Sequence, residues 1–216
     1  MTWCVRIAAL AMALLAEAGQ AGDVASGRYR AVQGPEMASH LEIGEDGRFA
    51  YALSYGALDE RAEGRWARME RGIALTTVPK PQPPEFRLDH AGPQGEGDAA
   101  LFVLVRWPDG RGIAGVDVRL GLNTGAVVEG YTQEYGWSLG DLGTALPQWI
   151  ELADPYHGFR SARFAISKEV RSIIVTLVPH DMGIAAFEGV LLEGGAEGEA
   201  VLHHPMGDIR YRRVQK

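Results

Sequence analysis

The sequence predicts an all-β protein, and three observations lead to that expectation. Short apolar stretches, many alternating with polar residues, recur along the chain and are separated by glycine-containing turns. Helical patterns are nearly absent beyond the N-terminal segment, and SKEVRS (167–172) would form one turn at most. The proline-rich stretch 79–86 cannot lie in a central strand, because proline lacks the N–H that the ladder needs. It therefore divides the strands into two groups.

Residues 1–21 have the order of a secretory signal peptide, with a basic residue, an apolar run and then small residues. The run follows Arg6, and both Ala18 and Ala21 are candidate last residues of the cleaved segment. A membrane-spanning helix needs about 20 apolar residues, and this run is too short to cross a bilayer comfortably, so an uncleaved anchor is only the second interpretation. Cleavage would remove the only cysteine, Cys4. We therefore expect a periplasmic or secreted protein with no disulfide and no membrane span.

Residues 22–90 are predicted to form a domain of antiparallel β-hairpins. Asp46-Gly47 lies between two strand-like runs, which is a strong hairpin signal. Aromatic and aliphatic residues alternate with other residues in the second run, at Phe49, Tyr51, Leu53 and Tyr55. GRYRAV, AEGRWARM and GIALTTV indicate further strands. The acidic pair Asp59-Glu60 falls in a polar connection, and we expect both carboxylates to be solvated.

Residues 98–180 are predicted to form an immunoglobulin-like β-sandwich. ALFVLVRW is almost continuously apolar, as in a strand covered on both faces, and GVDVRLGL alternates cleanly. QWIELAD and RSIIVTLVP complete the set. The segment 181–216 carries three more strands, which either extend the sandwich or return to the N-terminal hairpins. We predict the return, because closing a small antiparallel barrel removes the unpaired edges of the hairpins.

The stretch VVEGYTQEYGWSLGDL (127–142) is either a binding site or a turn between strands. Thr132 can hydrogen-bond the backbone of its own turn, Gly136 can adopt a positive φ, and Trp137 can anchor the next strand in the core. These roles account for the conspicuous residues without a ligand. We therefore expect a structural turn.

The order LFVLVRWPDGRGIAGVDVRL, GYTQEYGWSL, WIEL, YHGF and IIVTLVP resembles the carboxypeptidase regulatory-like, or transthyretin-like, sandwich module over about residues 100–180. The positions that carry the resemblance are Gly115, Val118, Thr132, Gly136 and Trp137. GRY, DGRF and GRW in the flanking segments are similar to lipocalin-type hairpins. One transthyretin-like relative is hydroxyisourate hydrolase, whose terminal signature is Tyr-Arg-Gly-Ser. This chain ends YRRVQK, so the resemblance does not imply that activity.

The composition and motifs exclude several classes of function. A formal net charge of −7 with only three lysines disfavours nucleic acid and anionic membrane surfaces. The sequence has no nucleophile elbow, P-loop or dinucleotide fingerprint, so we predict no catalytic residue and no cofactor. Weak metal candidates are His180, Asp181 and His203. The neighbouring His204 points to the opposite face of a strand from His203, and a solvated turn before Pro205 accounts for both.

Aromatic residues are the remaining sign of a binding surface. Tyr135, Trp137, Tyr156 and Phe159 fall within one third of the chain, and exposed aromatic rings on a sandwich can grip sugars or peptides. We expect a non-enzymatic, exported β protein of the cell envelope that docks an envelope protein or a carbohydrate. The alternative is a small-molecule carrier with a lipocalin-like cavity lined by Phe49, Tyr51, Leu53 and Trp66, and a weaker alternative is a metal-dependent enzyme or metal-binding protein.

Overall fold

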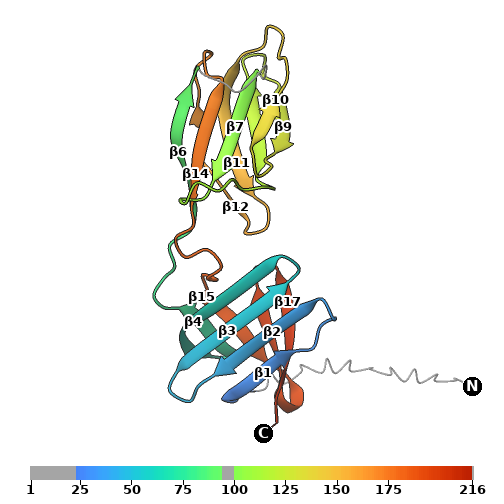
Figure 1. Cartoon of the computed structure of the whole chain (residues 1–216). Coiled ribbons are helices and arrows are strands. Elements are labelled where there is room, and N and C mark those ends of the chain that lie inside the picture. Colours follow the sequence, from blue (N-terminus) through green and yellow to red (C-terminus); the bar gives the residue numbers. More distant parts are fainter. Residues whose placement is uncertain (1–22, 94–99, 216) are drawn as a thin grey trace, which may run out of the picture.

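The computed structural model of the chain describes residues 23–93 and 100–215. It is an all-β protein built from an eight-stranded antiparallel barrel and two further small sheets (Figure 1). The expected signal peptide, Cys4 included, lies outside the described residues. The segment SKEVRS forms one turn, closed by a hydrogen bond of 3.1 Å from the Val170 N–H to the Ser167 carbonyl, and a 3-10 turn lies at Ala196–Gly198.

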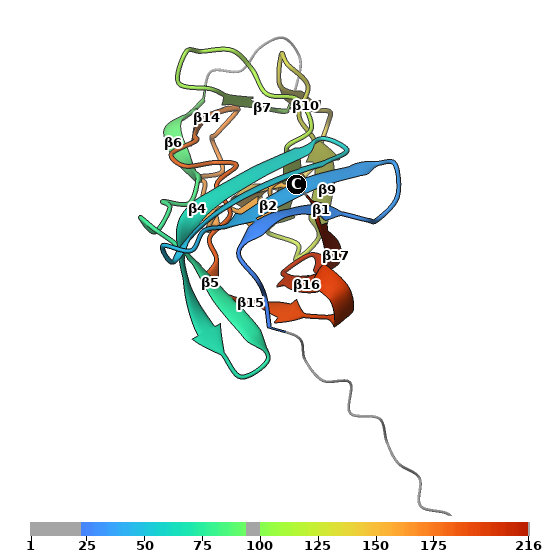
Figure 2. The ribbon, with the colours of Figure 1, turned by 90° about the horizontal axis from the view of Figure 1, so that it is seen from below.

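The C-terminal strands return to the N-terminal hairpins and close the barrel, in the order β1-β17-β16-β15-β5-β4-β3-β2. Viewed from below, β15, β16 and β17 complete the ring begun by the N-terminal strands (Figure 2). The predicted closure is therefore confirmed. The strands are β1 (Gly27–Ala31), β2 (Met37–Ile43), β3 (Arg48–Tyr55), β4 (Leu58–Met69), β5 (Gly72–Thr77), β15 (Glu188–Gly194), β16 (Glu199–His204) and β17 (Gly207–Arg213).

The Asp46-Gly47 turn shows how local sequence sets the barrel register. Gly47 has a φ of 79°, and the Asp46 carboxylate accepts a hydrogen bond of 3.1 Å from the backbone N–H of Arg48. β2 and β3 then pair without a bulge from Ile43 opposite Phe49 onward. This register places Phe49, Tyr51 and Leu53 in the core, as their alternation predicts.

The second part has two sheets that share one apolar core. One sheet has the order β10-β7-β14-β6, with β7 and β14 parallel, and the other has the order β12-β11-β8-β9, with β13 paired to β11. The core lies between inward-facing residues of both sheets. The strands are β6 (Glu85–Gly92), β7 (Leu101–Arg106), β8 (Asp117–Leu122), β9 (Val127–Tyr131), β10 (Trp137–Leu139), β11 (Pro147–Asp154), β12 (Phe159–Arg160), β13 (Phe164–Ala165) and β14 (Ser172–Val178).

β6 belongs to the small sheets, whereas the sequence-based division of the chain places most of it with the N-terminal hairpins. A boundary at residue 90 assigns most of this strand to the N-terminal domain, yet β6 pairs with β14 along its whole length. The reason is its apolar face, because Phe86 is buried in the core of the two small sheets and Leu88 packs against it.

Two connecting segments join the barrel to the small sheets, and they are tied to each other and to the barrel. The Asp181 carboxylate accepts a hydrogen bond of 2.8 Å from the backbone N–H of Gln82, and the Asp181 N–H donates to the Gln82 carbonyl at 3.2 Å. Arg61 of β4 donates its N–H to Gly183, and its carbonyl accepts from Ala185. The junction is therefore braced by backbone hydrogen bonds. None of the helical segments in the described part of the chain is long and apolar enough to cross a membrane.

Candidate functional site

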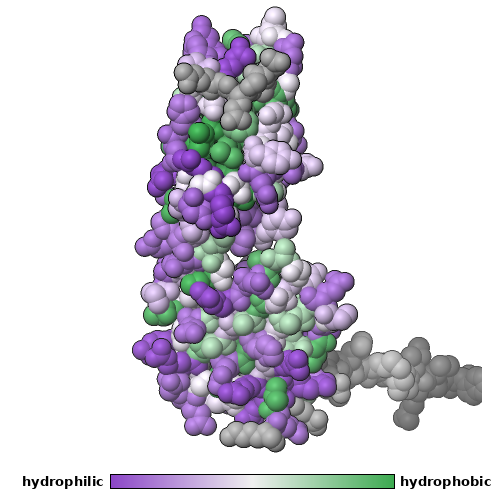
Figure 3. Space-filling view, viewed as in Figure 1, coloured by the Kyte–Doolittle hydropathy of each residue, from purple (hydrophilic) through white to green (hydrophobic). Residues whose placement is uncertain are grey.

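The surface is hollowed where the barrel meets the small sheets. One hollow of about 310 Å³ lies against the proline-rich connection, and a second of about 420 Å³ lies between the barrel rim and the loop after β11. Both are lined by Glu60, His157 and Ala186, and we call the two together the junction cleft. In the space-filling view, pale green hydrophobic side chains lie among purple ones along the barrel rim (Figure 3).

The loop that borders the cleft from the small sheets is held by Asp154. One carboxylate oxygen of Asp154 accepts the backbone N–H groups of Tyr156 at 2.9 Å and His157 at 3.0 Å, and the other lies 3.1 Å from the His157 Nδ1. Gly158 allows the return of the chain with a φ of 69°. The Asp154 bonds thus fix the loop backbone while the Tyr156 side chain stays 57% exposed beside the cleft.

The barrel side of the cleft contains a buried imidazole and a carboxylate. The His204 Nδ1 accepts the backbone N–H of Met206 at 3.2 Å, so the proton of a neutral ring lies on Nε2. That Nε2 is 3.2 Å from Oε2 of Glu60, but the two groups are not aligned as a hydrogen bond. Oε2 of Glu60 and the Tyr51 hydroxyl are both buried without a hydrogen-bond partner among the residues described. A donor and an acceptor are thus left open at the same end of the barrel.

These groups belong to a polar cluster inside the barrel, which we define as Ser39, Tyr51, Glu60, His204 and Tyr211. Burial raises the pKa of Tyr51 far above its ordinary value, and the neighbouring Tyr211 and Glu60 raise it further. Burial also raises the pKa of Tyr211 to about 12, against the opposing effect of its hydrogen bond with Ser39. Both phenols therefore stay neutral at physiological pH.

The four aromatic residues that the sequence singled out are divided between surface and core. Tyr135 is 81% exposed in the turn before β10, and Tyr156 is exposed at the cleft. Trp137 is half-buried over Gly130, and Phe159 is half-buried with its ring stacked on Phe86 at 5.1 Å. Tyr156 and Phe159 line the junction cleft, whereas Tyr135 and Trp137 do not.

Thr132 and Gly136 have structural roles. Thr132 is fully buried, and its hydroxyl donates to the Ile113 carbonyl at 2.6 Å and accepts the Val116 N–H at 3.1 Å. The expected bond within its own turn is therefore replaced by a bridge to the neighbouring segment, because the Thr132 side chain points into the sandwich. Gly136 has a φ of 98°, as a turn glycine requires.

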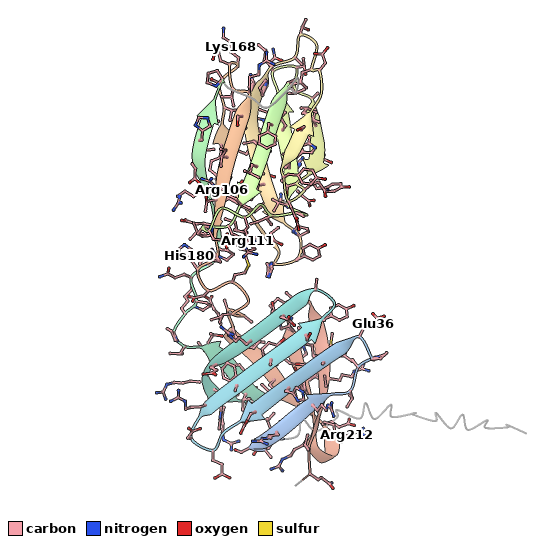
Figure 4. The ribbon with its side chains drawn as sticks, viewed as in Figure 1. Glu36, Arg106, Arg111, Lys168, His180 and Arg212 are labelled. Atoms are coloured by element: carbon pink, nitrogen blue, oxygen red, sulfur yellow. The ribbon has the colours of Figure 1, made fainter. Side chains whose placement is uncertain are left out.

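The weak metal candidates lie in three different surroundings. His180 lies in the connection below the small sheets (Figure 4), where its Nε2 is 3.7 Å from Glu85. Asp181 is engaged by Gln82, and His203 lies between Glu193 at 3.0 Å and Asp208 at 2.9 Å. Within residues 23–93 and 100–215, no group of three or more His, Cys, Asp or Glu side chains has a metal-binding arrangement.

Sequence reasoning missed His204 and Glu60. The expected solvated turn is wrong for both histidines, because both lie in β16: His203 is half-exposed there, and the His204 side chain is only 3% exposed. The expectation of two solvated acids holds for Asp59 and is wrong for Glu60, because β4 already begins at Leu58 and turns Glu60 inward. Inward-facing residues alternate along both strands. Continuing this alternation from Ala62 back to Glu60, and from Leu202 on to His204, would have found both side chains.

The residues proposed to line a carrier cavity occupy the barrel interior. Phe49, Tyr51 and Leu53 are buried core side chains, and Phe187 packs against the first two with ring centroids at 6.1 and 5.0 Å. Trp66 is half-buried and donates its indole N–H to the Gly44 carbonyl at 2.9 Å. These contacts fill space that a lipocalin-like carrier would reserve for its ligand.

The geometry defines an all-β protein with a closed eight-stranded barrel, two further small sheets and a cleft where they meet. No family model, curated protein or solved structure matches the chain.

Proposed function

We propose that this protein is a non-enzymatic docking module of the cell envelope, and that it binds a segment of a partner protein in the junction cleft. The observation that carries the proposal is the pairing of exposed apolar side chains, Tyr156 and Met206, across a cleft built from both parts of the fold. Each is 57% exposed, and partly open aromatic and methionine side chains are enriched where proteins bind one another.

The shape of the cleft favours an extended protein segment over a flat sugar ring. Its two hollows follow each other along the junction, and prolines from the connection and from both rims line them. Apolar walls of this kind accept alternate side chains of an extended peptide. A carbohydrate platform would instead present several aromatic rings on one face, and here Tyr135 and Tyr156 lie on different loops.

The remaining parts of the proposal come from the sequence. The charged, apolar and small-residue order of residues 1–21 supports export to the periplasm or the medium. The resemblance of residues 100–180 to carboxypeptidase regulatory-like, or transthyretin-like, modules supports an accessory binding role, and the lipocalin-like hairpins supply the barrel. The partner is then an envelope or extracellular protein.

Site-specific photo-crosslinking in the producing cells tests the proposal. Benzoylphenylalanine replaces Tyr156 or Met206 in the cleft, Met69 at the far end of β4 as a matched exposed control, and Tyr135 as a second surface. We expect both cleft positions to give the same adduct, with the cross-linked peptide identified by mass spectrometry, and Met69 to give none. Equal products from Met69, or adducts from Tyr135 alone, would contradict the assignment of the cleft.

Native mass spectrometry of the same protein distinguishes docking from the two other functions. A retained small molecule in place of an adduct would favour a carrier, and a retained sugar would favour a carbohydrate binder.

A further inference from the structure

The larger hollow of the junction cleft has an acidic and aromatic floor. Its lining includes the carboxylate of Glu60 and the rings of Phe187 and His204, and it contains no lysine or arginine. The Tyr51 ring lies behind them, with centroid distances of 5.0 Å to Phe187 and 6.0 Å to His204, and Phe187 and His204 are 5.8 Å apart. Three rings thus pack beside one carboxylate.

The polar atoms of this floor are incompletely satisfied. Tyr51 lies behind the lining and is 3% exposed, and its hydroxyl has no hydrogen-bond partner within the described chain. Oε2 of Glu60 has the His204 Nε2 at 3.2 Å but forms no aligned hydrogen bond with it. A buried carboxylate oxygen without a hydrogen bond costs free energy, and native structures retain such groups where a ligand, ion or water completes them. The open positions are acceptors for a group rich in N–H donors, because a phenol oxygen can accept as well as donate.

We infer that the floor of the cleft binds an ammonium group, presented by a lysine side chain of the docked partner. An ammonium carries three donors, compensates the charge of Glu60 and is attracted by the faces of the aromatic rings that line the hollow. The apolar stem of a lysine fits the remaining walls, which include Leu58, Pro205 and Met206. This inference rests on the proposed docking function and names the chemistry that the partner must supply.

Charge outside the hollow agrees with a cationic partner group. The chain has a net charge of −7, and the nearest cation of the connection, Lys80, is 2.5 Å from Glu188 and is thereby neutralised. The other imidazole of the hollow, His157, is held by Asp154. A positively charged side chain therefore meets no repelling group among the described residues that line the hollow.

Three small probes separate charge from shape. N-acetyl-lysine amide carries the ammonium, its Nε-acetyl derivative has a longer neutral head, and N-acetyl-norleucine amide keeps only the stem. Binding is measured by two-dimensional NMR titration of the full chain. We expect millimolar binding of the lysine probe and at least about tenfold weaker binding of the two neutral probes, as for a partly desolvated ion pair with aromatic contacts.

Variants locate the binding. Glu60→Gln removes the charge with little change in shape and should weaken the lysine probe by about tenfold or more, whereas Asp59→Asn, the exposed neighbour on the same strand, should stay within about twofold. The Glu60→Gln spectrum shows whether the barrel is folded, and Ala186→Trp, at an exposed position of the lining, blocks the hollow without touching the core.

Equal binding of the charged and neutral probes, no binding of the lysine probe, or full binding to Glu60→Gln and Ala186→Trp would overturn the ammonium site. The photo-crosslinking result is independent of these titrations. Cleft adducts without binding of the lysine probe would leave the docking function in place and remove the ammonium site. Binding of the lysine probe without cleft adducts would leave the ammonium site in place and remove the docking function.

Discussion

The barrel and the two small sheets each have an apolar core of their own but place their polar groups differently. In the barrel, the polar cluster of Ser39, Tyr51, Glu60, His204 and Tyr211 lies inside one end of the core. In the small sheets the core is aliphatic and aromatic, and the charged network around Glu151 lies on the outer face of β11. A network on the surface adds to stability, whereas open polar groups in a core lower it. The comparison therefore supports the barrel end, and not the charged sheet, as the proposed binding region.

The largest effect should come from the aliphatic core. Ile150 is fully buried between the small sheets, so Ile150→Ala should lower their free energy of unfolding by about 2 to 5 kcal/mol through lost burial and a new cavity. In a Trp66→Phe background the remaining described tryptophans, Trp107, Trp137 and Trp149, report on this part during urea unfolding.

Ile73→Ala is the matched change in the barrel core, where Ile73 is also fully buried. With Trp66 retained as reporter, it should shift the barrel transition and leave that of the small sheets in place, because the two cores share no cluster. A single transition moved equally by both variants would show that the two parts unfold as one unit and would remove the basis for comparing them.

The next largest effect concerns the charged network around Glu151 on the outer face of β11, whose contribution to stability should depend on pH. Burial alone would raise the pKa of Glu151, but hydrogen bonds from Arg119 and Arg163 and the charge of Arg160 outweigh it and lower the pKa. A lowered pKa gives stability that is present above the unfolded value and lost as the pH falls through the folded value. Glu151→Gln should therefore cost roughly 1 kcal/mol near pH 7, and the cost should shrink as the pH falls from the ordinary pKa value of 4.5 toward pH 3.

Urea unfolding of wild type and Glu151→Gln across this pH range measures the difference. Glu129→Gln is the control, because Glu129 also contacts Arg119 but is 68% exposed, and its effect should stay below about 0.5 kcal/mol. A Glu151→Gln cost that grows toward acidic pH would contradict the sign derived from the arginine contacts.

A smaller effect of opposite sign is expected on the barrel surface. The hydrogen bond with Glu193 raises the pKa of His203 against the effect of burial, and Asp208 adds to the increase. A raised pKa gives stability that is complete below the ordinary value of 6.5 and is lost as the pH rises through the folded value. His203→Gln should cost about 0.2 to 1 kcal/mol near pH 5.5 and less near pH 9, since the ring is partly exposed.

The pH dependence of thermal unfolding of His203→Gln, with the exposed His40→Gln as control, checks this sign. Arg71 also contacts Glu193 and keeps part of the network when His203 is replaced. A cost that increases above pH 7 would mean that His203 acts as a neutral acceptor and not as a cation.

The sequence predicted the barrel and its closure because alternation and turn chemistry are local signals. Phe49, Tyr51 and Leu53 follow from their spacing, and the Asp46-Gly47 turn sets their register. The candidate site was harder, since it depends on where strands begin and end. Glu60 lies near the start of the long strand β4, and His204 is the last residue of the short strand β16. Their polar neighbours and Pro205 make both stretches resemble loops in the sequence, and their proximity arises only from barrel closure. Among the aromatic candidates, Tyr156 is exposed and Phe159 is half-buried. A sequence pattern does not predict the exposure of side chains at strand ends.

The smallest stability effect is the most informative about function. The Tyr51 hydroxyl has no hydrogen-bond partner in the described chain, so Tyr51→Phe removes a buried polar group at no cost and should leave the free energy of unfolding within about 0.5 kcal/mol, or raise it. Tyr211→Phe is the matched control, because that hydroxyl bonds Ser39, and it should cost about 1 kcal/mol. Urea unfolding of both variants gives the two values. If Tyr51→Phe is as destabilising as Tyr211→Phe, the hydroxyl has a structural partner such as an internal water, and it no longer marks a ligand site. If Tyr51→Phe is neutral for stability but weakens binding of the lysine probe, phenylalanine packs the core equally well, and the hydroxyl is retained at the barrel end for binding.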